Sequence, residues 1–180
     1  MRELTSKRLY FRQLSGDDAT ETYASWLNDP AINRFLEVRY TQHSVESCRS
    51  FIETCNADPS SFLFGIFVDD GKTHIGNIKL GAIDWRYSSG QISLFIGDKC
   101  CMGAGYATES ILAISRFGFI ELGLSRLEAG CYEDNLGSLR AFLKAGFSVE
   151  GFFRKKFTID GNRTGCFWLG ALKDEWTVDL

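Results

Sequence analysis

The sequence predicts one α+β domain over residues 1–180, built on a mixed, mostly antiparallel sheet flanked by helices. A length of 180 residues matches a single domain, and a hydrophobic content of 44% is enough for one sizeable core. Strand-like segments in the middle of the chain, separated by turn residues, predict an antiparallel meander. Helix-like segments precede and follow this meander, and no repeat or linker interrupts the series.

The N-terminal region combines one strand with two helices. Apolar and polar residues alternate over 9–14 (LYFRQL), which predicts the first strand. Asp17 or Asp18 is then placed to cap a helix that runs to about Leu27. Pro30 breaks that helix and begins a second, short one.

A third helix and the strand meander follow. Ser44 caps the helix, in which apolar residues return at helical spacing. The continuous apolar run 62–68 (FLFGIFV) is typical of a central strand. Turn residues (DDG) lead from it into a strand at about 75–83, and alternation over 91–96 predicts the next strand.

The second half of the chain alternates helices and strands. Small residues open a helix that ends near Gly123. The later elements are, in order, a strand at 126–132, a helix from Asn135 to Gly146, and strands at 147–157 and 163–172. The predicted order is β-α-α-α-β-β-β-α-β-α-β-β.

Composition excludes several classes of protein. A formal net charge of -3 with 24% charged residues disfavours disorder and polybasic nucleic-acid binding, so no nucleic-acid partner is expected. No apolar run approaches the ~18 residues that span a bilayer, and the start MRELTSKRLYFRQL is charged throughout, unlike a signal peptide. We therefore expect a cytoplasmic protein with no membrane partner. The six Cys form no C-x-x-C pair and are read as reduced thiols, with no metal site.

The segment 102–108 (MGAGYAT) predicts an anion site. Small residues that lead into a helix leave its first N–H groups accessible to a phosphate. No Gly-Lys-Ser/Thr follows, and Thr108 stands where the dinucleotide fingerprint requires a third Gly or Ala. From the residues alone, a tight turn that serves packing remains an equal alternative.

Several segments together resemble the GNAT N-acetyltransferases, in particular the branch of ribosomal-protein alanine N-acetyltransferases and amino-sugar acetyltransferases. The segments are LTSKRLYFRQL, WLNDPAINRFLEVR, GNIKLGAID, SLFIGDKCCMGAGYATES, CYEDNLGSLRAFLKAGF and GCFWLGALKDEW, and they span nearly the whole chain. The resemblance implies a GNAT-like domain that uses acetyl-CoA as co-substrate. It implies that the pyrophosphate binds the loop residues Met102, Gly103, Ala104, Gly105, Tyr106, Ala107 and Thr108.

The resemblance also implies a binding path for the pantetheine arm. It would pair with a splayed strand at Leu94, Phe95 and Ile96, although an ordinary core strand explains these residues equally well. Asn135 would bond the pantetheine and Ser138 would lie beside the CoA sulfur; by pattern alone both are helix-start residues.

One position departs from the common GNAT pattern. Phe142 stands where the resemblance implies a contact with the cofactor and where a Tyr often protonates the leaving thiolate. A phenyl ring cannot donate a proton. Ser138 is therefore the candidate acid or orienting group.

The attacking amine must lose a proton before or during transfer. Asp84 and Glu37 are the candidate bases, with solvated or capping carboxylates as the alternative reading. Planar cations and indoles that could hold a nucleotide-linked amino sugar are Trp26, Arg34, Arg39, Trp85 and Arg86. These arginines are otherwise surface residues that solubilise the domain.

The leading hypothesis is direct attack of a small primary amine, such as a nucleotide-linked amino sugar, on acetyl-CoA. The alternatives are acetylation of a (ribosomal) protein N-terminus and a CoA-binding sensor domain without catalysis. A homodimer is compatible with the sequence.

Overall fold

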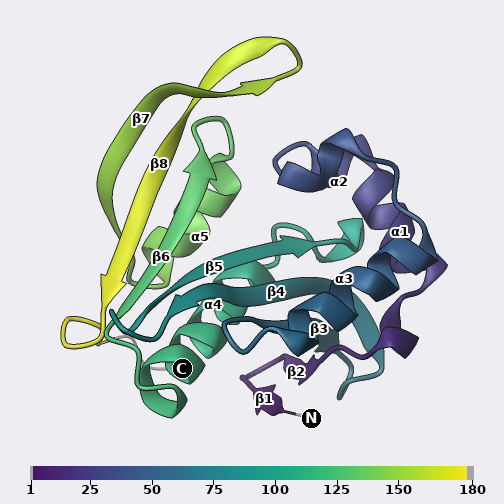
Figure 1. The fold of residues 1–180 in the computed structure, drawn as a ribbon, viewed down its shortest axis with the longest axis horizontal. Helices are drawn as coiled ribbons and strands as arrows, with labels where there is room; N and C mark the ends of the chain where they lie inside the picture. The colour runs from purple at the N-terminus through teal and green to yellow at the C-terminus, as the bar shows by residue number, and fades with distance from the viewer. Residues whose placement is uncertain (1, 178–180) are drawn as a thin grey trace.

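In the computed structural model, which describes residues 2–177, eight strands form one open sheet in the order β1-β2-β3-β4-β5-β6-β8-β7 (Figure 1). The strands are β1 (Glu3–Thr5), β2 (Tyr10–Gln13), β3 (Phe62–Val68), β4 (Thr73–Asp84), β5 (Ser89–Ile96), β6 (Arg126–Tyr132), β7 (Ser148–Ile159) and β8 (Asn162–Leu172). Neighbouring strands are antiparallel except β5 and β6, which are parallel. The mixed, mostly antiparallel sheet predicted from the sequence is confirmed.

Helices cover both faces of this sheet. They are α1 (Glu21–Asn28), α2 (Pro30–Asn33), α3 (Val45–Ala57), α4 (Tyr106–Arg116) and α5 (Leu136–Lys144), with short 3-10 turns η1 (Gly16–Asp18), η2 (Glu37–Tyr40) and η3 (Lys99–Cys101) and a π-helical turn η4 (Phe117–Glu121). None of the helices within residues 2–177 has the length and apolar character needed to cross a membrane.

Two apolar cores lie on opposite faces of the sheet because strand side chains alternate in direction. Phe64 and Ile66 of β3 pack in the cluster that contains Ile111 and Ile114 of α4. Leu63 belongs to the second cluster, together with buried residues of α1 and α3. The helical layer predicted before the meander therefore covers one face, and the later helices cover the other.

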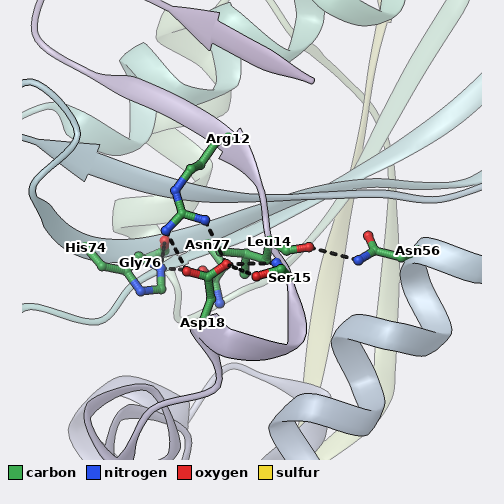
Figure 2. A network of polar contacts seen from close by, with 8 residues as sticks. All are labelled: Arg12, Leu14, Ser15, Asp18, Asn56, His74, Gly76 and Asn77. Carbon is green, nitrogen blue, oxygen red and sulfur yellow. Dashed lines mark hydrogen bonds and ion pairs between the residues drawn. The ribbon is translucent and has the colours of Figure 1, made fainter. Parts of the chain in front are cut away.

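The start of α1 differs from its prediction. Thr20, not Asp17 or Asp18, caps the helix, and its hydroxyl accepts a hydrogen bond from the amide of Tyr23. Asp18 instead receives two hydrogen bonds from the guanidinium of Arg12, at 2.7 and 2.5 Å (Figure 2). A paired carboxylate on the preceding 3-10 turn resembles a helix cap in sequence.

The first strand, β1, was not predicted because its three residues are too few for a recognisable alternation. It pairs with β2 at the edge of the sheet, where Leu4 lies opposite Phe11. The remaining strands and helices lie where the hydrophobic pattern places them, and strands 62–68 and 126–132 match their predicted bounds.

Strands β5 and β6 diverge, and this divergence leaves an opening in the sheet between them. Their pairing covers three residue pairs, from Ser89 with Arg126 to Gln91 with Glu128. Beyond Gln91, β5 stays paired with β4 up to Ile96, while β6 continues beside β8. The two strands form a V in Figure 1, with α5 beside one arm.

Candidate active site

A cavity of about 780 Å³ occupies the opening between β5 and β6 and reaches both faces of the sheet. Its wall on one side includes Leu94 of β5 and Phe142 of α5, and on the other Leu27 of α1 and Phe51 of α3. A bound molecule can therefore pass from one face of the sheet to the other between the two strands. Most of the exposed wall is apolar.

The α5 side of the cavity brings together most of the pantetheine-contact residues expected from the sequence. Leu94, Asn135, Ser138 and Phe142 line this side. Phe95 lines the cavity from the opposite face of the sheet, where its ring stacks on that of Tyr23. Asn135 also caps α5, since its Oδ1 accepts the amide of Ser138 at 3.2 Å. The cap fixes the orientation of the Asn135 side chain. The Ser138 hydroxyl takes no part in the cap and faces the adjoining wall of the cavity.

Ile96, the remaining residue expected on this path, ends β5 opposite Gly76 of β4. It packs against the main core cluster and is half-buried. The structure thus puts Ile96 beyond the wall formed by Leu94 and Phe95, toward the loop that leads to α4.

Cys131 is a cavity residue that the sequence did not reveal. Its Sγ lies 3.3 Å from the Ser138 hydroxyl, and both side chains line the cavity. Burial raises the pKa of the Cys131 thiol to about 11, so the sulfur is protonated at neutral pH. The six cysteines, all within the described residues, are free thiols.

The loop at the end of β5 has the geometry of an anion site. Gly103 and Gly105 adopt left-handed backbone angles, φ 76° and 85°, which side chains rarely take. A Cβ on Gly103 would meet nothing within 4 Å, so the turn is open to a ligand. The first intrahelical bond of α4 runs from Glu109 N to Gly105 O at 3.1 Å, which leaves the amides of the first turn to other partners.

The seven loop residues expected to contact the pyrophosphate surround this helix start. Met102, Gly103, Ala104 and Gly105 form the turn, and Tyr106, Ala107 and Thr108 form the first turn of α4. Accessible amides, small residues and the positive end of a helix suit a diphosphate. The residues present therefore fit the coenzyme that the resemblance implied.

Arg8 adds a cation to this loop, and the sequence did not single it out. Its Nη1 donates to the carbonyl of Ala104 at 3.1 Å, and the guanidinium lies 4.5 Å from the centre of the Tyr106 ring. Its Nε pairs with Glu109 at 2.8 Å. Arg8 thus anchors the N-terminal region to the turn while it keeps positive charge beside Gly105.

On the opposite side of the cavity, Glu37 and Tyr132 form a pair. The phenol of Tyr132, at the end of β6, donates a hydrogen bond to Oε1 of Glu37 in η2, and both residues line the cavity. Burial and this hydrogen bond to the carboxylate raise the pKa of Tyr132 to about 12. Tyr132 therefore stays a neutral donor at physiological pH.

Arg39 holds this pair in place and is not a free surface cation. Its Nη1 donates to the Tyr132 hydroxyl at 3.1 Å and to the carbonyl of Leu36 at 2.7 Å. Its Nη2 donates to the Tyr40 hydroxyl at 2.6 Å and to the carbonyl of Thr158 at 3.1 Å. Because the phenol oxygen accepts from Arg39, its own proton is directed to the carboxylate.

The other residues predicted for the acceptor site lie elsewhere. Among the residues that the structure describes, the cavity wall includes none of Trp26, Arg34, Asp84, Trp85 and Arg86. Asp84 caps the turn after β4, where its Oδ1 accepts the amide of Arg86 at 2.9 Å. Arg34 pairs with Asp160 at 3.7 Å, and Trp85 is 50% exposed.

Trp26 serves the packing of the core. It is 8% exposed and its ring lies 5.1 Å from that of His74. His74 is half-buried among aromatic rings, and its Nε2 lies 2.9 Å from the carbonyl of Gly76 and 2.7 Å from Oδ1 of Asn77 (Figure 2). Burial lowers the pKa of His74, which keeps it neutral. Both residues are structural.

Within residues 2–177, no group of three or more His, Cys, Asp or Glu side chains is arranged to hold a metal ion. The polar side chains that line the cavity include the carboxylate of Glu37, the phenol of Tyr132 and the hydroxyl of Ser138. A sheet opened between two parallel strands, with a glycine turn at its end, is the arrangement expected of the GNAT-like domain that the resemblance implied.

Comparison with known proteins identifies the family. The model of the acetyltransferase (GNAT) domain matches residues 8–148, so this chain belongs to the GNAT acetyltransferase family. In Bacillus subtilis (strain 168) it is 34% identical to YjcK, named as a probable N-acetyltransferase, over 88% of this chain and 90% of that protein. YoaA of the same strain, named as an uncharacterized N-acetyltransferase, is 32% identical over 84% and 86%.

Solved structures share the fold. The spermidine N-acetyltransferase from Vibrio cholerae, in complex with CoA and spermine, superposes with a TM-score of 0.85 at 19% identity and covers 95% of this chain and 99% of its own. The predicted family, fold class and acyltransferase activity are confirmed by these relatives and structures.

Proposed function

We propose that this protein transfers the acetyl group of acetyl-CoA to a primary amine by direct attack. The observation that carries the proposal is the cavity between β5 and β6, which joins the predicted pantetheine contacts on one face of the sheet to a carboxylate on the other. A thioester that enters from the α4 and α5 side and an amine that enters from the α1 and α3 side would meet between the strands.

The chain's own residues would hold the coenzyme at three places. The glycine turn and the first amides of α4 bind the diphosphate, with Arg8 adding positive charge. The edge of β5 beyond Gln91 pairs with the pantetheine as an added strand would. Asn135 bonds the arm, and Phe142 packs against it. When bound, acetyl-CoA supplies the activated acetyl group.

Two side chains on opposite sides of the cavity carry out proton transfer. Glu37 accepts the proton that the ammonium group of the acceptor must lose, because it is a carboxylate that faces the cavity and is held by Tyr132. The Ser138 hydroxyl, beside Cys131, serves the departing sulfur in place of the tyrosine that Phe142 replaces. An amide of β5 that points away from β4 donates to the carbonyl oxygen under attack.

The pKa and the positions of the cysteines disfavour an acyl-cysteine intermediate. Burial raises the pKa of Cys131, the cysteine nearest Ser138, so it is a poor nucleophile. Cys100 and Cys101 belong to the turn η3 before the glycine loop. Free thiols and the use of acetyl-CoA fit a cytoplasmic enzyme.

The test combines binding with turnover. Calorimetry should give heat on addition of acetyl-CoA, and a thiol reagent should detect CoA release when a primary amine is added. No heat would exclude the coenzyme assignment. Binding without release, over amines and N-terminal peptides alike, would favour the sensor alternative. Release with peptides alone would favour acetylation of protein N-termini.

A further inference from the structure

The acceptor side of the cavity carries one carboxylate, Glu37, whose Oε1 lies 3.9 Å from Nη1 of Arg39. Among the described residues that line the cavity, Glu37 is the sole carboxylate and Lys79 the sole Lys or Arg. The Lys79 ammonium lies 5.6 Å from the centre of the Phe51 ring. One carboxylate can pair one ammonium, whereas a second ammonium on the acceptor would find a lysine in the same cavity.

Aromatic rings pack around Tyr132, the hydrogen-bond partner of Glu37. Tyr132 contacts Phe157 with ring centres 5.0 Å apart and Phe35 with ring centres 6.1 Å apart, and all three rings line the cavity. Trp168 lines the same wall. Arg39, Arg34 and Lys156 already lie over the rings of Tyr132, Phe35 and Phe157, at 5.2, 5.4 and 5.3 Å from the ring centres. These rings therefore offer apolar surface, which suits the apolar body of an amine.

The guanidinium groups that a diphosphate needs are committed elsewhere. The two Nη atoms of Arg39 donate to four oxygens of the protein itself, and its side chain is 9% exposed. Arg34 pairs with Asp160. Bidentate phosphate recognition requires guanidinium donors free to face the ligand. The cavity therefore does not suit the nucleotide-linked amino sugar expected from the sequence.

We propose that the acceptor is a monoamine with an apolar, aromatic body, an arylalkylamine in chemical class. This inference rests on the proposed function and names its substrate. The ammonium pairs with Glu37, the apolar body lies against Phe35, Phe157 and Trp168, and the amine nitrogen loses its proton to Glu37 before it attacks the thioester carbon. The attached nitrogen gives up its second proton, which passes through the Ser138 hydroxyl or water to the departing sulfur, so the carbon–sulfur bond breaks, CoA leaves as the thiol and a neutral amide forms.

The first experiment measures kcat/KM with saturating acetyl-CoA for 2-phenylethylamine, spermidine and a UDP-linked amino sugar. We expect 2-phenylethylamine to exceed the other two by about tenfold or more, the scale at which matched pockets discriminate. Equal or better turnover of spermidine or the nucleotide sugar overturns the inference while the proposed acetyl transfer stands. No CoA release with any amine overturns the proposed function, and the inference with it.

The second experiment locates the apolar body. Phe35→Ala should raise KM for 2-phenylethylamine about fivefold, a typical loss for a truncated pocket ring, with KM for acetyl-CoA unchanged. Phe35→Leu, which keeps apolar volume, should give a smaller rise and covers the case in which the alanine variant fails to fold. Tyr87→Ala, at an aromatic residue 69% exposed outside the cavity, is the control. Unchanged KM in both Phe35 variants overturns the assignment.

Discussion

The phenol of Tyr132 donates a hydrogen bond to the carboxylate of Glu37, which lies 95 residues earlier in the chain. The contact links the end of β6 to the turn η2 across the cavity. It leaves the second carboxylate oxygen available to an amine. The pair therefore joins the sheet, which would position the thioester, to the helical layer, which would position the acceptor.

Replacement of the carboxylate tests the proton acceptor. Glu37→Gln keeps the shape and a hydrogen-bond acceptor for Tyr132 but cannot take a proton, so we expect kcat/KM for the amine to fall about 100-fold. KM for acetyl-CoA should not change. Thiol release measures both constants. Glu46→Gln, an exposed glutamate on α3, is the matched control, and equal rates in the two variants would remove Glu37 from the mechanism.

Removal of the phenol tests how Glu37 is held. Tyr132→Phe deletes the hydroxyl and keeps the ring, so kcat should fall about tenfold while the apolar contacts remain. If Tyr132 acts through Glu37, the Tyr132→Phe/Glu37→Gln double variant should be no slower than Glu37→Gln alone. Additive losses, measured in the same assay, would mean that the phenol acts independently.

The pKa of Tyr132 makes a related prediction about pH. Burial and the hydrogen bond to Glu37 raise that pKa to about 12, so the phenol keeps its proton over the working range. Tyr132→Phe should therefore leave the alkaline part of the pH profile of kcat unchanged below about pH 10. An alkaline limb in that range that disappears with Tyr132→Phe would assign a titrating role to the phenol.

Ser138 can be tested without loss of the helix cap. The cap bond is made by the backbone amide of Ser138 to Oδ1 of Asn135, so Ser138→Ala removes the hydroxyl alone. We expect kcat to fall about tenfold with KM for acetyl-CoA nearly constant. Asn135→Ala should instead cost about 1 kcal/mol of stability and raise KM for acetyl-CoA. An unchanged kcat in Ser138→Ala would leave water as the acid.

The sequence predicted the elements that obey a period and missed features that depend on distant contacts. The runs 62–68 and 126–132 are buried strands whose composition is decisive, and the structure gives them the predicted bounds. Asp18 resembled a helix cap because a capping carboxylate and an ion-paired one look alike until Arg12 is placed beside it. The sequence around a residue does not show which side chain from another segment lies beside it in the fold.

The candidate site likewise contains residues that local sequence pattern predicts and residues that only distant contacts reveal. The glycine turn and Asn135 lie in one continuous segment each, so local pattern was enough to propose them. Tyr132 gave no sign in sequence, since a tyrosine at the end of a strand is ordinary until η2 brings Glu37 to it. Arg39 appeared to be a free cation because nothing in the sequence shows the carbonyl of Thr158 beside it.

The glycine turn permits a test with a matched control. Gly105 has φ 85° and Gly123 φ 71°, so an alanine at either should cost about 1–2 kcal/mol of backbone strain. Gly105→Ala alters the turn expected to hold the diphosphate, whereas Gly123 follows η4. Calorimetry should show acetyl-CoA bound about tenfold more weakly by Gly105→Ala only. Equal affinities of the Gly105→Ala and Gly123→Ala variants for acetyl-CoA would mean that the diphosphate does not bind at this turn.

The pair of Arg12 and Asp18 predicts how stability depends on pH (Figure 2). Burial alone would raise the pKa of Asp18, but hydrogen bonds from Arg12 and Ser15 outweigh it and hold that pKa below its usual value. A lowered carboxyl pKa means that the pair stabilises the fold above about pH 4, the pKa in the unfolded chain, and that this stabilisation is lost as the pH falls further.

Arg12→Gln should therefore lower the free energy of unfolding by about 2 kcal/mol at neutral pH, since it leaves a part-buried carboxylate without its cation. The difference from the unaltered protein should shrink as the pH falls below about 4 and vanish once the pH has passed the lowered pKa of Asp18, because protonation then removes the ion pair. Urea unfolding at several pH values measures this. Arg49→Gln, whose exposed partner Asp17 lies 3.7 Å away, should change stability by less than about 0.5 kcal/mol. A pH-independent difference for Arg12→Gln would mean that its contact with the Phe67 ring, 4.5 Å away, and not the ion pair, stabilises this corner of the sheet.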